Sequence, residues 1–257
     1  MSWLACRSIA PHAQAGPDQS RFILEDGGIV RGPVDRRRLA LVFTGHEFAE
    51  GATTILNVLA QRRAKASFFL TGVFLRNPAF REAVKRMVRE GHLVGPHSDA
   101  HLLYCPWTGP KVTLVPRDTF LSDLEANIRA LQPYGIARDE VRYFLPSYEW
   151  YNREIVEWTR EAGLTLVCHT KGTRSNADYT EEGTRQFVAT VKILESIYTR
   201  EREDPQGLNG FLLLLHVGAG PRRKDKLHYR FAELVEYLVA RGYELTRVDT
   251  LLETKRR

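Results

Sequence analysis

Short apolar runs alternate with longer segments of helical spacing along most of this chain. The runs have the length and composition of buried parallel strands, and the segments between them place apolar residues three or four apart. Seven such runs occur, at 39–43, 66–70, 92–95, 141–145, 164–168, 211–215 and 243–248. Repeated β/α units of this kind predict an α/β fold whose parallel strands close into a barrel.

No linker or low-complexity stretch divides the chain. Residues 1–25 lack a regular pattern and are expected to form an irregular lead-in, and residues 26–257 are expected to form one barrel domain. Helices are predicted at 53–63, 78–90, 118–131, 153–162, 184–198 and 231–241. The segments 102–117 and 170–183 are expected to be long loops.

Polar side chains follow several of the predicted strands. In a parallel barrel the carboxyl ends of the strands meet at one rim, and active sites lie at this rim. The residues in these positions are Thr44, Gly45, His46, Glu47, His97, His101, Tyr148, Glu149, His169, Asp178 and His216. Their convergence favours an active or binding site at this rim.

The segment His97-Ser98-Asp99-Ala100-His101 carries the strongest chemical signal. Gly95 and Pro96 end the preceding strand, and we expect a helical turn after them, which places residues four apart on one face. Two imidazoles on one face can share a transition metal, and Zn, Co, Ni or Fe(II) would each suit this ligand type.

Composition limits the function classes without selecting one. The chain has 257 residues, is 43% hydrophobic and 26% charged, and carries a formal net charge of +6. Its basic clusters are short and scattered, so no nucleic-acid partner is expected. No apolar run approaches the roughly 20 residues of a membrane span, and no signal peptide is visible. The three cysteines do not form a disulfide framework. Oligomeric state and compartment stay open.

Several segments together resemble the polysaccharide deacetylase family, the NodB-homology carbohydrate esterases. The similar segments span about residues 38–253. They are Lys65-Ala-Ser-Phe-Phe-Leu-Thr-Gly72, Glu90-Gly-His-Leu-Val-Gly-Pro-His-Ser-Asp-Ala-His101, Phe144-Leu-Pro-Ser-Tyr148, Asp178-Tyr179, Leu213-Leu-Leu-His216 and Arg241-Gly-Tyr243. The resemblance implies a distorted (β/α)7 barrel, a metal held by His97 and His101, and a carbohydrate substrate.

The chain departs from this family in its first motif. The family ends its first strand with two aspartates, a catalytic base and then a metal ligand, where this chain has Thr44 and Gly45. The arginine that orients the base aspartate in the family is replaced by Leu145. Loss of both partners together fits either loss of activity or a rebuilt site.

We favour a rebuilt site, because His46 and Glu47 follow directly and Gly45 allows a sharp turn. One hypothesis places His46, His97 and His101 on the metal, with Glu47 as the general base. The other makes Glu47 the third ligand. The metal is expected to be Zn, with Co, Ni or Fe as alternatives.

The expected reaction is metal-assisted hydrolysis of an N-acetyl or O-acetyl group on a carbohydrate. The resemblance implies that the Tyr148 N–H holds the oxyanion and that His216 protonates the leaving group, with Asp178 orienting His216. Glu149, Trp150 and Trp107 are expected to bind substrate. Two alternatives remain: an inactive, deacetylase-like glycan-binding protein, and an amidohydrolase acting on a small non-glycan amide.

Overall fold

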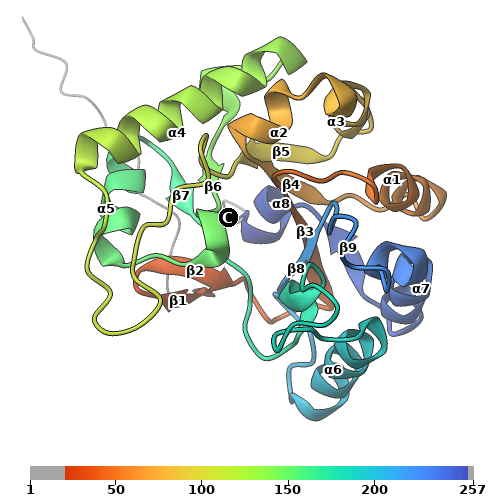
Figure 1. Cartoon of the computed structure of the whole chain (residues 1–257). Helices are drawn as coiled ribbons and strands as arrows, with labels where there is room; N and C mark the ends of the chain where they lie inside the picture. Colours follow the sequence, from red (N-terminus) through yellow and green to blue (C-terminus); the bar gives the residue numbers. More distant parts are fainter. Residues whose placement is uncertain (1–20, 254–257) are drawn as a thin grey trace, which may run out of the picture.

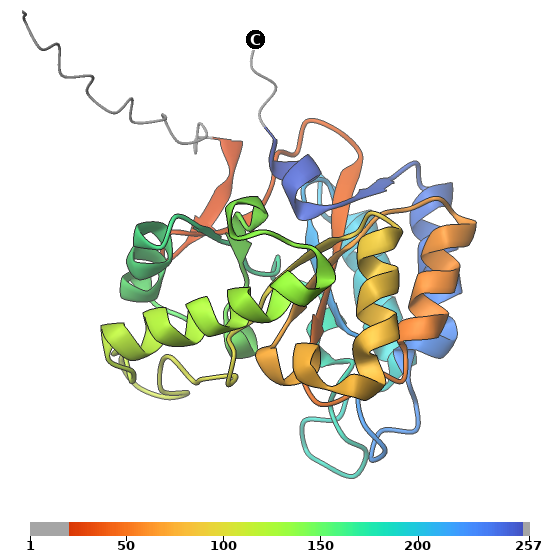
Figure 2. The same ribbon diagram turned by 90° about the horizontal axis from the view of Figure 1, so that it is seen from above.

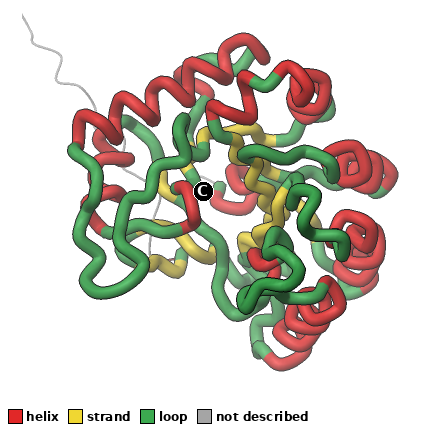
Figure 3. Tube along the Cα trace, in the orientation of Figure 1, coloured by secondary structure: helices red, strands yellow, loops and turns green. Residues whose placement is uncertain are grey.

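The computed structural model describes residues 21–253. Its strands are short and lie at the centre of the molecule (Figures 1 and 3). They are β1 Ile23–Glu25, β2 Gly28–Arg31, β3 Arg38–Gly45, β4 Ser67–Leu70, β5 Leu93–Pro96, β6 Tyr143–Phe144, β7 Thr165–Leu166, β8 Leu212–His216 and β9 Glu244–Thr246. The order β5-β4-β3-β8 is parallel throughout, and β9 pairs with the first half of β3.

The remaining strands close this sheet into a barrel. The Leu145 N–H donates to the Pro96 carbonyl, which joins the parallel pair β6-β7 to the edge strand β5. On the other side, β2 lies between β7 and β8, with a parallel bridge at Ile29–Val167 and an antiparallel bridge at Arg31–Phe211. The predicted barrel is therefore confirmed. The hairpin β1-β2, which fills the gap between β7 and β8, was not predicted.

Helices surround the strands (Figure 3). They are α1 Ala52–Gln61, α2 Gly72–Arg76, α3 Arg81–Arg89, α4 Arg117–Leu131, α5 Arg153–Glu161, α6 Thr190–Glu203, α7 Phe231–Ala240 and α8 Val248–Leu252. In Figure 2, α3, α1 and α7 stand next to one another along one flank, where α1 contacts both neighbours. Within residues 21–253, no helix has the length and apolar character needed to cross a membrane.

The strands alternate between two buried layers, and this alternation positions the site. Along β3, Leu39, Leu41 and Phe43 pack against the helices, whereas Ala40 and Val42 pack inside the barrel. Because side chains on a strand have a period of two, Thr44 continues the inward series. The same reasoning along β8 turns His216 inward after Leu212 and Leu214. Both side chains therefore reach the carboxyl end of the barrel interior.

Two sequence-based expectations differ from the structure at element boundaries. The helix predicted at 184–198 is α6, which begins at Thr190. Its start is delayed because the buried Arg223 guanidinium donates to the carbonyls of Thr180 and Val188, while the Thr190 N–H donates to Asp225. Most of the expected lead-in at 1–25 lies outside the described residues, and its last three residues form β1.

Candidate active site

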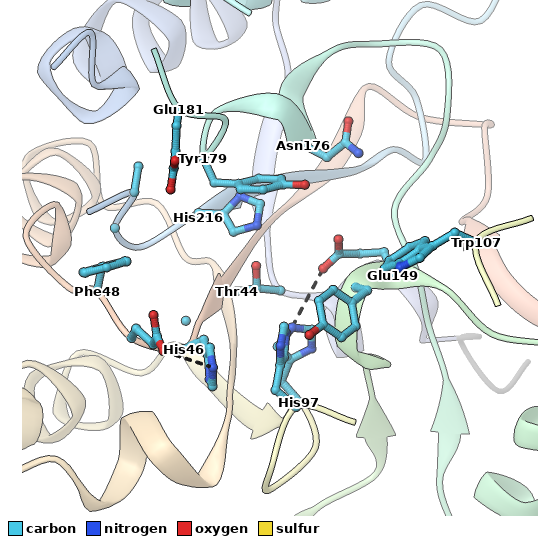
Figure 4. A pocket seen from close by; sticks show the side chains of 16 residues that line it. Thr44, His46, Phe48, His97, Trp107, Glu149, Asn176, Tyr179, Glu181 and His216 are labelled. Carbon is cyan, nitrogen blue, oxygen red and sulfur yellow. Dashed lines mark ion pairs between the residues drawn. The ribbon is translucent and has the colours of Figure 1, made fainter. Parts of the chain in front are cut away.

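A cavity of about 420 Å³ opens at the carboxyl ends of β3, β5, β6 and β8 (Figure 4). Its lining includes most of the residues singled out in the sequence: Thr44, Gly45, His46, Glu47, His97, His101, Trp107, Tyr148, Glu149 and His216. Phe48, Asn176, Tyr179, Glu181, Gly218 and Ala219 complete it. The predicted convergence of polar side chains at one rim is therefore observed as a single cavity.

The segment from His97 to His101 is not the helical turn we expected. Ser98 and His101 have positive φ angles of 68° and 56°, so the backbone loops instead of coiling. Asp123 on α4 holds this loop, because its carboxylate accepts hydrogen bonds from the Ser98 hydroxyl and from the N–H groups of Asp99 and Ala100. The loop still brings the His97 and His101 rings together, with their centroids 5.3 Å apart.

The His97 ring is held in one orientation by the backbone around it. The His97 N–H donates to Asn127 Oδ1 at 2.7 Å, and Nδ1 lies 2.8 Å from the Leu145 carbonyl oxygen. A carbonyl can only accept, so Nδ1 carries the proton and the Nε2 lone pair faces the cavity. Burial lowers the pKa of His97 to about 3 and keeps the ring neutral.

His46 and His101 complete a cluster of three imidazoles, which we call the histidine wall. His46 Nδ1 lies 3.1 Å from Thr71 Oγ1. The His46 ring stacks on His101 with centroids 4.4 Å apart and an interplanar angle of 17°. Burial lowers the pKa of His46, and it lowers the pKa of His101 to about 2. All three side chains are therefore neutral at physiological pH.

The opposite wall of the cavity carries a histidine whose protonated form is favoured. His216 Nδ1 donates to Asp178 Oδ1 at 2.6 Å, and the His216 N–H donates to Asp178 Oδ2 at 2.9 Å. Burial opposes protonation here, but the Asp178 charge and hydrogen bond outweigh it, so the pKa of His216 is raised. The ring of Tyr179 packs beside His216, with centroids 4.7 Å apart. His216 can therefore act as a proton donor toward the cavity.

The two positions that depart from the family's first motif have different surroundings. Thr44 points into the cavity, and its buried Oγ1 has no hydrogen-bond partner among the described residues. At Gly45, an added Cβ would lie 2.8 Å from Leu70 Cδ2 and 2.9 Å from Phe74 Cδ2. The packing of Leu70 and Phe74 thus explains why position 45 has no side chain.

The cavity carboxylates are unequal in exposure. Glu47 is 64% exposed at the rim, with Oε1 4.0 Å from His46 Nε2. Glu149 is only 10% exposed, and its Oε1 lies 3.8 Å from His97 Nε2. Burial raises the pKa of Glu149 to about 7. Glu181 is partly exposed and pairs with Arg222 at 2.6 Å.

Aromatic side chains form one edge of the opening. Trp107 is exposed and meets the Tyr148 ring edge-on, with centroids 5.3 Å apart. Trp150 does not line the cavity. It stacks behind Trp107 at 6.3 Å, and its indole N–H donates to the Pro106 carbonyl. Trp107 and Tyr148 can therefore contact a ligand, while Trp150 supports Trp107.

The donor chemistry of the histidine wall suits a transition metal, but the placement of its side chains does not. Neutral imidazoles are good ligands, and a second ring nitrogen bound to the backbone, as in His97, is typical of metal sites. Among residues 21–253, however, no three His, Cys, Asp or Glu side chains are positioned to hold one ion. The stacked rings of His46 and His101 aim their lone pairs along nearly parallel planes instead of at one point. The predicted metal and its three ligands stay predictions.

Sequence reasoning missed the residues that support the histidine wall from α4. Asp123 and Asn127 are buried on the face of α4 that also carries Leu124, Ile128 and Leu131. Two polar residues four apart on an otherwise apolar face are the signal that could have revealed them, because buried polar groups need partners.

The chain belongs to the polysaccharide deacetylase family, whose model matches residues 31–167. A chitooligosaccharide deacetylase from Bradyrhizobium is 26% identical over 200 residues, which cover 74% of this chain and 80% of that protein. Two other curated relatives are matched over only 38% and 45% of their own length.

Solved structures of the family have the same fold. PdaA from Bacillus subtilis, a family 4 carbohydrate esterase, superposes with a TM-score of 0.68 at 19% identity, covering 88% of this chain and 85% of that one. BA3943 from Bacillus anthracis, a pseudoenzyme of the same family, superposes with a TM-score of 0.67 at 18% identity, covering 90% and 70%. The likeness spans the whole barrel.

Proposed function

We propose that this chain removes acetyl groups, N-linked or O-linked, from a carbohydrate. One observation carries the proposal: a single cavity places His216, which is hydrogen-bonded to Asp178 behind it, opposite His46 and His97 of the histidine wall, and Glu149 lies between His97 and His216 (Figure 4). Family membership supports it, as does the activity named for the Bradyrhizobium relative.

Substrate would enter along the aromatic edge. Trp107 and Tyr148 offer ring faces on which a sugar can stack, and Tyr179 lies across the opening beside His216. A cavity of about 420 Å³ is within the ordinary size range of sites for small ligands. One acetylated sugar would occupy it, and the rest of a longer chain would lie over the rim.

His216 would act as the general acid. Asp178 fixes the Nδ1–H tautomer and favours the imidazolium, so Nε2 presents a proton to the cavity. When the bond to the acetyl carbon breaks, that proton passes to the leaving amine nitrogen or sugar oxygen. By the family resemblance, the Tyr148 N–H holds the oxyanion.

A second candidate is a barrel that binds acetylated glycans without turning them over. Thr44 and Gly45 in place of the two aspartates favour it, and so does the absence, among residues 21–253, of three side chains placed to hold a metal. The fold neighbour BA3943, a pseudoenzyme, is an example of this fold without activity.

The two candidates are separated by measuring acetate release and binding on the same samples. The protein, as purified and after loading with Zn, Co, Ni or Fe(II), is incubated with N-acetyl chitooligosaccharides and O-acetylated xylooligosaccharides. Acetate released by the protein, absent in a buffer control, supports the deacetylase. Binding without acetate under every metal condition supports the glycan-binding candidate. Neither binding nor acetate from any substrate contradicts both.

A further inference from the structure

At the end of β3, Thr44 presents a hydroxyl to the barrel interior where the family has a carboxylate. Thr44 follows Ala40 and Val42 in the inward series, so its side chain ends in the cavity and not among the helices. By register Thr44 pairs with His216 on β8. The buried Thr44 hydroxyl has no partner within residues 21–253. A ligand atom or water next to His216 would therefore meet a hydroxyl where the family has a carboxylate.

A carboxylate reaches the same part of the cavity from a different element. Tyr148 and Glu149, in the turn after β6, both have positive φ angles, of 59° and 53°. Non-glycine residues adopt this conformation at a cost, and such strain gathers at functional sites. Figure 4 shows the Glu149 carboxylate and the Thr44 hydroxyl turned into the central space between His97 and His216.

Glu149 differs from the other carboxylates of the cavity in being buried without an arginine or lysine partner among residues 21–253, and the cationic group that it faces is His216. Glu181 is paired with Arg222, and Glu47 is open to solvent at the rim. Glu149 is nine-tenths buried, and His97 Nε2, 3.8 Å from its Oε1, presents a lone pair because the His97 Nδ1 proton is donated to the Leu145 carbonyl. A carboxylate buried without a close ion-pair partner is costly unless a ligand or water uses it.

The apolar residue at position 145 is consistent with a neutral Thr44 opposite an acidic Glu149. Leu145 packs inside the barrel with Val42 and Val167, so position 145 supplies no arginine to orient a carboxylate at position 44. Two carboxylates, at 44 and 149, would repel each other across the cavity, with no arginine from position 145 between them. A neutral Thr44 and an acidic Glu149 are therefore mutually compatible.

We propose that Glu149 is the catalytic carboxylate of this chain and holds the attacking water in place of a carboxylate at position 44. This rests on the proposed function. The water oxygen bonds to the acetyl carbon as one of its protons passes to Glu149. The bond from that carbon to the sugar nitrogen or oxygen then breaks, and His216 protonates the leaving atom. Acetic acid and the free amine or alcohol result, and solvent returns both side chains to their starting protonation.

The test compares carboxylate variants of the full chain, with kcat and KM for acetate release and with substrate binding measured separately. Glu149→Gln should lower kcat about 10²–10⁴-fold, the usual contribution of a positioned acid or base, with binding changed less than about threefold. Glu47→Gln tests the rival base and should have a much smaller effect on kcat. Glu195→Gln, on the exposed face of α6, is the matched control.

Chemical rescue separates a chemical role from a structural one. Glu149→Gly suits the positive φ at this position and leaves a gap that formate can enter. Added formate should raise the kcat of Glu149→Gly severalfold and leave the wild type unchanged. A kcat retained in Glu149→Gln, a large loss in Glu47→Gln instead, or a loss in Glu149→Gly that formate does not restore would each overturn the assignment while leaving the deacetylase intact. A wild type that releases no acetate would overturn both the assignment of Glu149 and the proposed deacetylase function.

Discussion

The two walls of the cavity shift the pKa of the same kind of side chain in opposite directions. On the histidine wall, burial without an opposing carboxylate lowers the pKa of His97 to about 3 and that of His101 to about 2. Across the cavity, His216 is also enclosed, yet Asp178 at 2.6 Å raises its pKa. One carboxylate behind the ring decides whether a buried histidine offers a lone pair or a proton.

Removing that carboxylate should make His216 resemble the other histidines. In Asp178→Asn, burial is opposed only by the weaker attraction of Glu149, and the pKa of His216 falls. His216 must be protonated to act as the acid. When kcat is plotted against pH, the decline on the alkaline side should therefore move to lower pH. We expect kcat near neutral pH to fall by up to about 10²-fold, and His216→Ala to cost about 10²–10⁴-fold. An unchanged alkaline limb in Asp178→Asn would contradict the role of Asp178.

Acid should destabilise the histidine wall specifically. His97 and His101 bind protons in the unfolded chain near pH 6.5 but resist them when folded. The unfolded state therefore takes up more protons as pH falls from about 6.5 to 3, and the free energy of unfolding decreases over that window. Each such histidine contributes at most about 1.4 kcal/mol per pH unit.

Urea unfolding of the chelated protein at several pH values measures this effect. The variant His101→Gln should lose stability less steeply than the wild type between pH 6 and 4. His228→Gln removes a buried histidine outside the cavity lining, whose pKa burial also lowers, and measures the contribution of such a residue elsewhere. Parallel slopes for wild type and His101→Gln would show that the histidine wall is not held neutral.

Restoring the second aspartate of the family's first motif should cost stability. In Gly45→Asp, the new Cβ would lie under 3.0 Å from Leu70 and Phe74. Overpacking of this kind typically costs about 1–3 kcal/mol. Thermal melting should show the loss for Gly45→Asp, and the second change Phe74→Leu should recover part of it. An undiminished melting temperature in Gly45→Asp would mean that the end of β3 can rearrange freely.

The barrel could be predicted from sequence because its signals are local. Apolar runs and helical spacing located β3, β4, β5 and β8, and the alternation along β3 follows from strand geometry alone. The hairpin β1-β2 could not be found this way, since its role depends on closing a gap between β7 and β8, which are distant in sequence.

The sequence predicted which histidines line the cavity, but it did not predict the contacts and backbone conformations that position the side chains. The sequence placed His97, His101 and His216 at the rim, and all three line the cavity. It did not predict that Asp123 would stabilise a non-helical loop or that positive φ angles would turn Glu149 inward. Those features arise from contacts between elements, which the spacing of residues along the chain does not encode.

The most direct test is to follow a chitooligosaccharide, ¹³C-labelled in its acetyl groups, by NMR in the presence of the full chain. One spectrum series reports binding, through broadening of the bound acetyl signal, and turnover, through the appearance of free acetate. We expect both broadening and free acetate for the wild type, and broadening with little free acetate for His216→Ala and Glu149→Gln. Broadening without acetate in the wild type, under every metal condition, would contradict this expectation.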